Sequence, residues 1–307
     1  MKLRSVFVGY VEYESLYTRG IAEASARLGI EHTEVSIRTT LPRVDWEVRA
    51  AKPDLIWGHM LFWAPHNTLG RVDPNDILEL VEGWKRDLGC KVVLHDGDPR
   101  KATRFPHDIS SAVDLVLANH LVPRREWCTT VIQWPFAAPT YAEMAGPVPE
   151  FSTPHIAFTG TLRDDALYGS RTACLRALQD CDLLLVLPRP GEPNTLSRSA
   201  EVAASATAVI GFGQDIPGWI DTRVFQYAGA GGVLLHDDVG TLHGEPVLIP
   251  HKHYIPVKRY DVDSILGGLM EARRRGPEIR EAAFTWVQSR HTWVHRVQEV
   301  LDLLDLQ

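Results

Sequence analysis

The chain has 307 residues, with 32 lysines and arginines against 39 aspartates and glutamates, and its formal net charge at pH 7 is −7. This length is sufficient for two α/β domains, and the acidic balance argues against a general polyanion-binding protein, which would normally be basic. No apolar run reaches the roughly 20 residues that cross a bilayer, and the first residues lack the apolar core of a signal peptide. The sequence therefore predicts a cytoplasmic protein without a membrane span.

Strand and helix signals alternate through the first half of the chain. Strands are predicted at residues 5–9, 31–37, 54–58, 91–95 and 114–118, and amphipathic helices at 17–28 and 76–88. This alternation is typical of a doubly wound parallel sheet. The proline-rich stretch at 135–154 indicates a linker. Residues 1–145 are therefore expected to form a first Rossmann-like domain.

The same alternation returns after the linker. Strands are predicted at 155–160, 182–187, 208–212 and 233–236, and a helix at about 170–178. Residues 151–284 are expected to form a second Rossmann-like domain. Apolar residues at spacings of three and four then predict one amphipathic helix over about 285–307, which could pack back on the first domain. The expected architecture is α/β, with two Rossmann-like domains facing an interdomain cleft.

The segment 218–237 carries the most informative local pattern. Asp221 or Thr222 can cap a short helix, on which Arg223 and Gln226 lie three residues apart on one face. A helix N-terminus beside an arginine is a natural site for a diphosphate. The alternative is a solvated arginine at the start of a helix, but that position is unfavourable with the helix dipole unless an anion is near.

Three segments together resemble the glycosyltransferases of the two-Rossmann GT-B fold, in the group-1-like branch that includes spore-maturation glycosyltransferase-like proteins. The segments are Ile156–Gly160 with Arg171, then Arg223–Leu235, and finally His291-Thr292-Trp293 with Arg296. The resemblance covers the C-terminal half well and the N-terminal half by architecture. One departure is Gln226, which stands where the family usually has a glutamate.

The resemblance implies that the second domain binds a nucleoside-diphosphate sugar, such as a UDP-sugar, and that no further cofactor is required. Arg223, with Gly160 and Arg163, is expected to hold the diphosphate, helped by Asp221 and Thr222 at the start of the helix. Gln226 is expected to meet ribose or sugar hydroxyls, because its carbonyl can still accept hydrogen bonds without a charge. His236 and Asp237 end the next strand and are expected to border this donor site.

Residues after strands of the first domain are the acceptor-side candidates, because ligands of such folds bind at the carboxyl ends of strands. His95, Asp96 and Asp98 could orient an acceptor hydroxyl or accept its proton, and Tyr10 and His59 follow two other strands. An aspartate-capped turn explains the acidic pair equally well. Asp96 and Asp98 could also bind Mg²⁺, but the fold favours metal-independent transfer, so no metal site is predicted.

The expected activity is transfer of a hexosyl or pentosyl group from a nucleotide sugar to a hydroxyl acceptor, with retention of configuration implied by the resemblance. The acceptor is left open between a small molecule, a glycan and a hydroxylated base of phage-type DNA. Two alternatives remain: a catalytically impaired nucleotide-sugar-binding protein, motivated by Gln226, and a nucleotide-sugar epimerase of the same double-Rossmann shape.

Overall fold

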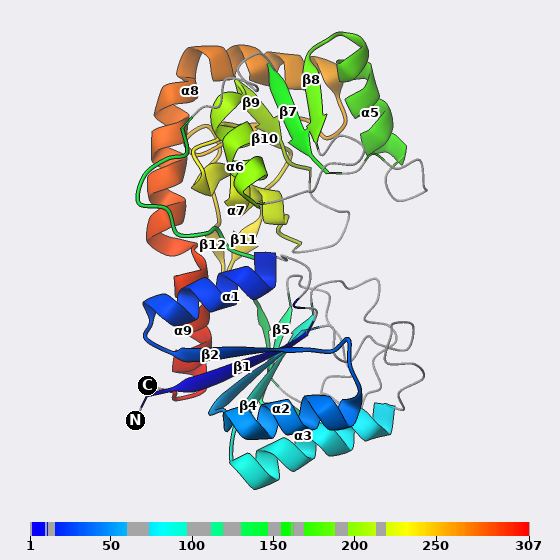
Figure 1. Ribbon diagram of the computed structural model, residues 1–307. Coiled ribbons are helices and arrows are strands. Elements are labelled where there is room, and N and C mark those ends of the chain that lie inside the picture. Colours follow the sequence, from blue (N-terminus) through cyan, green and yellow to red (C-terminus); the bar gives the residue numbers. More distant parts are fainter. Residues whose placement is uncertain are drawn as a thin grey trace. The chain divides into compact units, whose positions relative to one another are not determined.

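The computed structural model describes residues 2–9, 11, 16–59, 74–96, 112–118, 130–146, 155–160, 162, 169–187, 196–212 and 219–306 (Figure 1). The chain divides into two compact units. Unit 1 comprises Met1–Pro135 and Trp293–Gln307, and unit 2 comprises Phe136–Thr292. The chain therefore passes between the units twice. Within the described ranges, no helix combines the length and the apolar character needed to span a membrane.

Unit 1 contains, in its described part, a parallel sheet of six strands in the order β2-β1-β3-β4-β5-β6. The strands are β1 (Arg4–Gly9), β2 (Glu31–Ser36), β3 (Leu55–His59), β4 (Lys91–Asp96), β5 (Leu115–Ala118) and β6 (Thr130–Gln133). The helices are α1 (Leu16–Arg27), α2 (Leu41–Ala51), α3 (Pro74–Leu88) and α9 (Trp293–Leu303). In Figure 1, α2 and α3 cover one face of the sheet, and α1 lies with α9 on the other. Because both faces are covered, β1 and β5 are buried along nearly their whole length.

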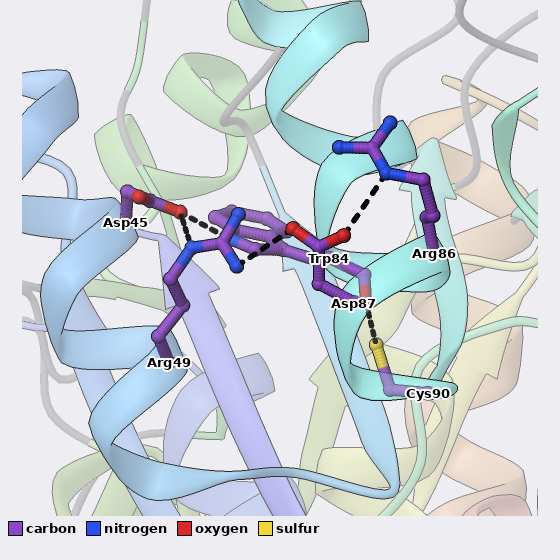
Figure 2. A network of polar contacts seen from close by, with 6 residues as sticks. All are labelled: Asp45, Arg49, Trp84, Arg86, Asp87 and Cys90. Atoms are coloured by element: carbon purple, nitrogen blue, oxygen red, sulfur yellow. Dashed lines mark hydrogen bonds and ion pairs between the residues drawn. The ribbon is translucent and has the colours of Figure 1, made fainter.

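Helices α2 and α3 are joined by a network of polar contacts (Figure 2). Asp45 Oδ1 accepts hydrogen bonds from Trp84 Nε1 at 2.8 Å and from Arg49 Nε at 2.7 Å. Arg49 Nη1 also donates to Asp87 Oδ2 at 3.0 Å, so the guanidinium of α2 links carboxylates on both helices. The indole of Trp84 is fully buried. The network therefore fixes the helix pair that covers one face of the sheet.

Unit 2 contains, in the part that is described, a parallel sheet of five strands in the order β13-β10-β9-β7-β8. The strands are β7 (Ile156–Thr159), β8 (Leu184–Leu187), β9 (Ala208–Ile210), β10 (Leu234–His236) and β13 (Ile255–Pro256), and β11 (Thr241–Leu242) pairs separately with β12 (Glu245–Pro246). The helices are α5 (Gly169–Asp180), α6 (Leu196–Ser205), α7 (Thr222–Gly229) and α8 (Val262–Arg290). Two Rossmann-like α/β units are thus present, as predicted. The interdomain cleft stays a prediction.

The C-terminal region differs from the prediction, because the single helix expected over about 285–307 is two helices. Helix α8 begins at Val262, where Asp261 caps it by accepting a hydrogen bond from Ser264 N at 2.8 Å, and it ends at Arg290. The backbone of His291 and Thr292 then leaves the helix: Ala138 N donates to His291 O at 2.9 Å, and Thr292 forms a bridge with Ala138. Helix α9 begins only at Trp293.

Helix α9 packs on α1 within unit 1. Gly20 of α1 makes this contact close, since a Cβ built there would lie 2.3 Å from the indole of Trp293. Trp293 also meets the buried rings of Tyr17 and Trp134 edge-on, with centroid separations of 5.7 Å in both cases. The second crossing of the chain therefore places an aromatic anchor in the core of unit 1.

Candidate functional site

The candidate site lies at the topological switch point of the sheet in unit 2. Strand β7 pairs with β8 on one side and with β9 on the other, so the chain reverses its direction of winding there. In open α/β sheets, ligands bind outside the carboxyl ends of the strands at such a point. Gly160 follows β7, and Gly211 follows β9. The two glycines therefore mark the edge of the sheet where a ligand is expected.

Arg223, in the first turn of α7, reaches this edge. Its Nε donates to Thr159 O at 2.8 Å, and its Nη1 donates to Asp221 Oδ2 at 2.6 Å. Its side chain is 19% exposed and that of Asp221 is 8% exposed, so the ion pair is largely shielded from water. These two contacts fix the guanidinium at the end of β7, although 64 residues separate Arg223 from Thr159.

The guanidinium of Arg223 lies over the ring of Phe158, 5.0 Å from its centroid, and the guanidinium of Arg171 lies 5.3 Å from the same centroid. Gly160 permits this arrangement. A Cβ at residue 160 would lie 2.9 Å from the Phe158 ring and 3.0 Å from Arg223 Nη2, and the residue has φ of +153°. The structure thus brings the predicted pair Gly160 and Arg223 together.

Tyr227 joins helix α7 to the end of β7 by hydrogen bonds. Its hydroxyl accepts a hydrogen bond from Thr159 N at 2.9 Å and shares another with Thr159 Oγ1 at 2.6 Å. Burial raises the pKa of the Tyr227 phenol, so the hydroxyl remains protonated at physiological pH. Sequence reasoning did not assign a role to Tyr227, although it stands inside the signature segment. The residue positions Arg223 one turn away on the same helix.

The N-terminus of α7 is capped by this chain itself. Asp221 Oδ1 accepts from Arg223 N at 2.8 Å, which confirms the predicted cap. Asp221 therefore orients Arg223 with both carboxylate oxygens, and its carboxylate compensates the positive end of the helix dipole. Thr222 opens the helix and is half-buried, as is Gln226 one turn further. The binding roles predicted for these three residues stay predictions.

A second group of polar residues follows β10. His236 ends this strand and is 1% exposed, and Asp237 next to it forms an ion pair with Arg259. Burial lowers the pKa of His236 to about 4, so its imidazole is neutral at physiological pH. The sequence provides no local signal for the Arg259 contact, because 22 residues separate Arg259 from Asp237.

Among the described residues, no group of three or more histidine, cysteine, aspartate and glutamate side chains is assembled. Arg163 lies outside the described residues. The described part of the site combines backbone, a neutral histidine and arginines, two of which pair with the carboxylates of Asp221 and Asp237. Arginine side chains and backbone N–H groups are the usual ligands of an anion.

Unit 1 has its own switch point between β1 and β3, because β1 pairs with both β2 and β3. His59 ends β3 and is paired in register with His95 of β4, and Asp96 is the last residue of β4. The backbone therefore gathers these acceptor-side candidates at the carboxyl edge of one sheet. Tyr10 and Asp98 lie outside the described residues.

His95 is fully buried, in contrast to what a residue facing an acceptor would require. Its ring stacks on Tyr17, with 4.1 Å between centroids and an interplanar angle of 16°, and meets Trp134 at 5.8 Å. Its neighbours are the buried aromatic residues that also surround Trp293. The ring of His95 therefore contributes to the core of unit 1. The acceptor-side roles of Asp96, Asp98, Tyr10 and His59 stay predictions.

Part of the chain matches a known protein family. Residues 170–302 match the model of a family described as glycosyl transferase-like, which confirms the resemblance inferred for the C-terminal half. This stretch contains Arg171, Arg223 and Gln226, and it extends through α8 into α9. No curated protein matches the sequence significantly.

Solved structures share the fold at low sequence identity. HepE from Anabaena, solved with UDP-glucose, is 12% identical, has a TM-score of 0.56, and the match covers 99% of this chain and 100% of that one. A putative UDP-N-acetylglucosamine 2-epimerase from Listeria monocytogenes is 10% identical, with a TM-score of 0.53 and coverage of 99% and 96%. The pneumococcal O-GlcNAc transferase GtfA is 8% identical, with a TM-score of 0.50 and coverage of 86% and 59%. These likenesses confirm the GT-B-like fold.

Proposed function

We propose that this protein is a glycosyltransferase that moves a sugar from a nucleoside-diphosphate sugar, such as a UDP-sugar, to a hydroxyl acceptor. The observation that carries the proposal is the Arg223 guanidinium, held at the switch point of unit 2 by Thr159 O and Asp221 beside Gly160. The family match of residues 170–302 and the fold shared with HepE, which was solved with UDP-glucose, support the same donor class.

The chemical role of Arg223 follows from its fixed position. As the bond between the sugar and the diphosphate breaks, negative charge grows on the leaving phosphate, and a preorganised guanidinium stabilises that charge. Asp221 and Thr159 hold the side chain in place before the donor arrives, so little reorganisation is needed during the reaction. Gln226, one turn along α7, would accept a hydrogen bond from a ribose or sugar hydroxyl.

Unit 1 would bind the acceptor at the carboxyl edge of its sheet. Asp96 at the end of β4, with Asp98 after it, would orient the acceptor hydroxyl and accept its proton, and Tyr10 and His59 would flank it at the ends of β1 and β3. The reaction would need no metal ion, since the charge of the leaving diphosphate would be balanced by arginine.

Calorimetry with UDP tests the donor site. The wild-type protein should bind UDP, and Arg223→Ala should weaken binding roughly 10- to 100-fold, because a charge-assisted hydrogen bond contributes about 1.5–3 kcal/mol. Arg223→Lys should recover part of the loss. Arg274→Ala, at an exposed position of α8, is the matched control and should bind like the wild type. Equal affinities for wild type and Arg223→Ala would contradict the assignment.

Turnover requires a separate assay. UDP-hexoses and UDP-pentoses incubated with the protein should release UDP slowly without acceptor, and activity should survive EDTA. If the protein binds a UDP-sugar but never releases UDP from it, the alternative of a nucleotide-sugar-binding protein is favoured. Gln226, in place of the family glutamate, is the residue that motivates this alternative.

An epimerase is the second candidate, favoured by the fold shared with the Listeria monocytogenes protein. Product analysis separates the two activities. A transferase consumes UDP-N-acetylglucosamine only by separating the sugar from UDP, whereas a 2-epimerase converts it to an isomer of the sugar without needing an acceptor hydroxyl. Accumulation of that isomer would replace the transferase assignment.

A further inference from the structure

His236 lies at the same edge of the unit 2 sheet as Gly160, two strands away from it. It is the last residue of β10, which lies next to β9 in the sheet, and Gly211 follows β9. A Cβ built on Gly211 would lie 3.4 Å from His236 Cδ2 and 3.6 Å from Arg223 Cβ. The imidazole edge that carries Cδ2 and Nε2 therefore flanks the same glycine as the stem of Arg223.

The hydrogen bond at the other ring nitrogen defines the tautomer. Asp238 N donates to His236 Nδ1 at 3.1 Å, so Nδ1 acts as an acceptor. Asp237 Oδ1 lies 3.2 Å from the same nitrogen but forms no hydrogen bond with it. Since Nδ1 uses its lone pair toward a backbone N–H, the proton of the neutral ring is on Nε2.

This Nε2–H is a buried donor without a hydrogen-bond partner in the described structure. Asp221 and Asp238 favour protonation of the ring and Arg223 opposes it, and the carboxylate of Asp237, which pairs with Arg259, also lies beside Nδ1. Burial has the largest effect and keeps the ring neutral. Leaving a buried donor unsatisfied destabilises the folded protein, so its presence calls for an explanation. A ligand oxygen at the switch point would satisfy it.

We propose that His236 is a donor-binding residue, whose Nε2–H donates a hydrogen bond to a diphosphate oxygen of the nucleotide sugar. The inference rests on the proposed function and deepens it, because it adds an uncharged hydrogen-bond donor to the charged guanidinium of Arg223. A neutral imidazole suits this position because its hydrogen bond orients the diphosphate. It does not add a second full charge, which would slow the release of the nucleoside diphosphate after transfer.

Two substitutions separate the ring nitrogens. His236→Gln places an amide NH₂ near the position of Nε2 and loses the acceptor for Asp238 N. His236→Asn keeps an acceptor near the position of Nδ1 and loses the Nε2 donor. We expect the Asn variant to bind UDP about tenfold or more weakly, and the Gln variant to stay within about threefold of wild type. His251→Asn is the control, since the side chain of His251 is 60% exposed.

The measurement is calorimetric affinity for UDP and for UDP-glucose, with thermal unfolding to show that each variant is folded. If wild type binds UDP and the Asn variant binds it equally well, the inference is overturned while the proposed function stands. If only UDP-glucose binding falls, His236 meets the sugar and the diphosphate contact is wrong. If wild type binds neither ligand, both the proposed function and this inference fail.

Discussion

Gly160 shows how one missing Cβ supports the candidate site. The residue follows β7, and its neighbours Phe158 and Arg223 come so close that a side chain at 160 would meet both within 3.0 Å. Its φ of +153° also lies where residues with a Cβ rarely occur. The glycine therefore leaves room for the guanidinium of Arg223, and this guanidinium is the group that would contact the ligand.

Gly160→Ala tests this role at the residue scale. The added methyl must displace the Phe158 ring or the Arg223 guanidinium, so we expect a loss of about 1–3 kcal/mol in the free energy of unfolding and weaker UDP binding. Gly146→Ala is the control, because a Cβ there meets nothing within 4 Å. Denaturant titration and calorimetry measure the two effects, and a Gly160→Ala protein that matches the control in both would contradict the argument.

At the scale of elements, the α2–α3 contact depends on one carboxylate. Asp45 accepts hydrogen bonds from both the buried indole of Trp84 and Arg49, and Arg49 continues to Asp87 (Figure 2). Removing this acceptor leaves a buried N–H unsatisfied, which costs more than the loss of an exposed ion pair.

Asp45→Ala should therefore lower the free energy of unfolding by about 1–3 kcal/mol. Glu47→Ala, on the same helix, is the matched control, since it removes the exposed ion pair with Arg43 and should cost under about 0.5 kcal/mol. Urea unfolding curves compare the two. Equal losses would mean that the network of Figure 2 does not stabilise the helix pair.

The end of α8 shows how tertiary contacts overrule local periodicity. The apolar spacing continues from α8 into α9, so the sequence predicts one helix. The backbone of His291 and Thr292 instead pairs with Ala138, far away in the chain, and this pairing interrupts the helix. No local sequence pattern near residue 291 predicts pairing with residue 138. Such a break cannot be inferred from spacing alone.

At the scale of the whole molecule, buried neutral histidines make stability depend on pH. Burial lowers the pKa of His236 in unit 2 and of His32 in unit 1 to about 4, from an ordinary value of 6.5. Between these values the unfolded chain binds protons that the folded chain does not. The contribution of these two histidines to the free energy of unfolding is therefore largest above pH 6.5 and falls as the pH decreases toward 4.

For His236, this difference amounts to about 2 kcal/mol between pH 7 and pH 5, at 1.36 kcal/mol for each pKa unit. Ligand-free His236→Gln cannot take up this proton, so it should lose less stability than wild type over the same range. His251→Gln should behave like wild type, because that side chain is 60% exposed. Urea unfolding at both pH values measures the effect, and identical pH dependence in all three proteins would contradict it.

Much of the fold could be predicted from local patterns. Strands β1, β4, β5, β7 and β10 each contain a run of apolar residues, and α1 and α3 have clear amphipathic spacing. Helices α2 and α6 and strand β6 were not predicted. Helix α6 is rich in serine and alanine and has few large apolar side chains, and β6 is half exposed.

The sequence by itself determined the alternation of strands and helices, the cap of Asp221 on α7, and the presence of an arginine and a glycine suited to a diphosphate. These features depend on residues a few positions apart. Only the tertiary structure decided that Thr159 meets Arg223 across 64 residues, that His95 is buried against Tyr17, and that His236 faces Gly211. The reason is physical: strand order and packing join distant segments, and such contacts leave no periodic signal along the chain.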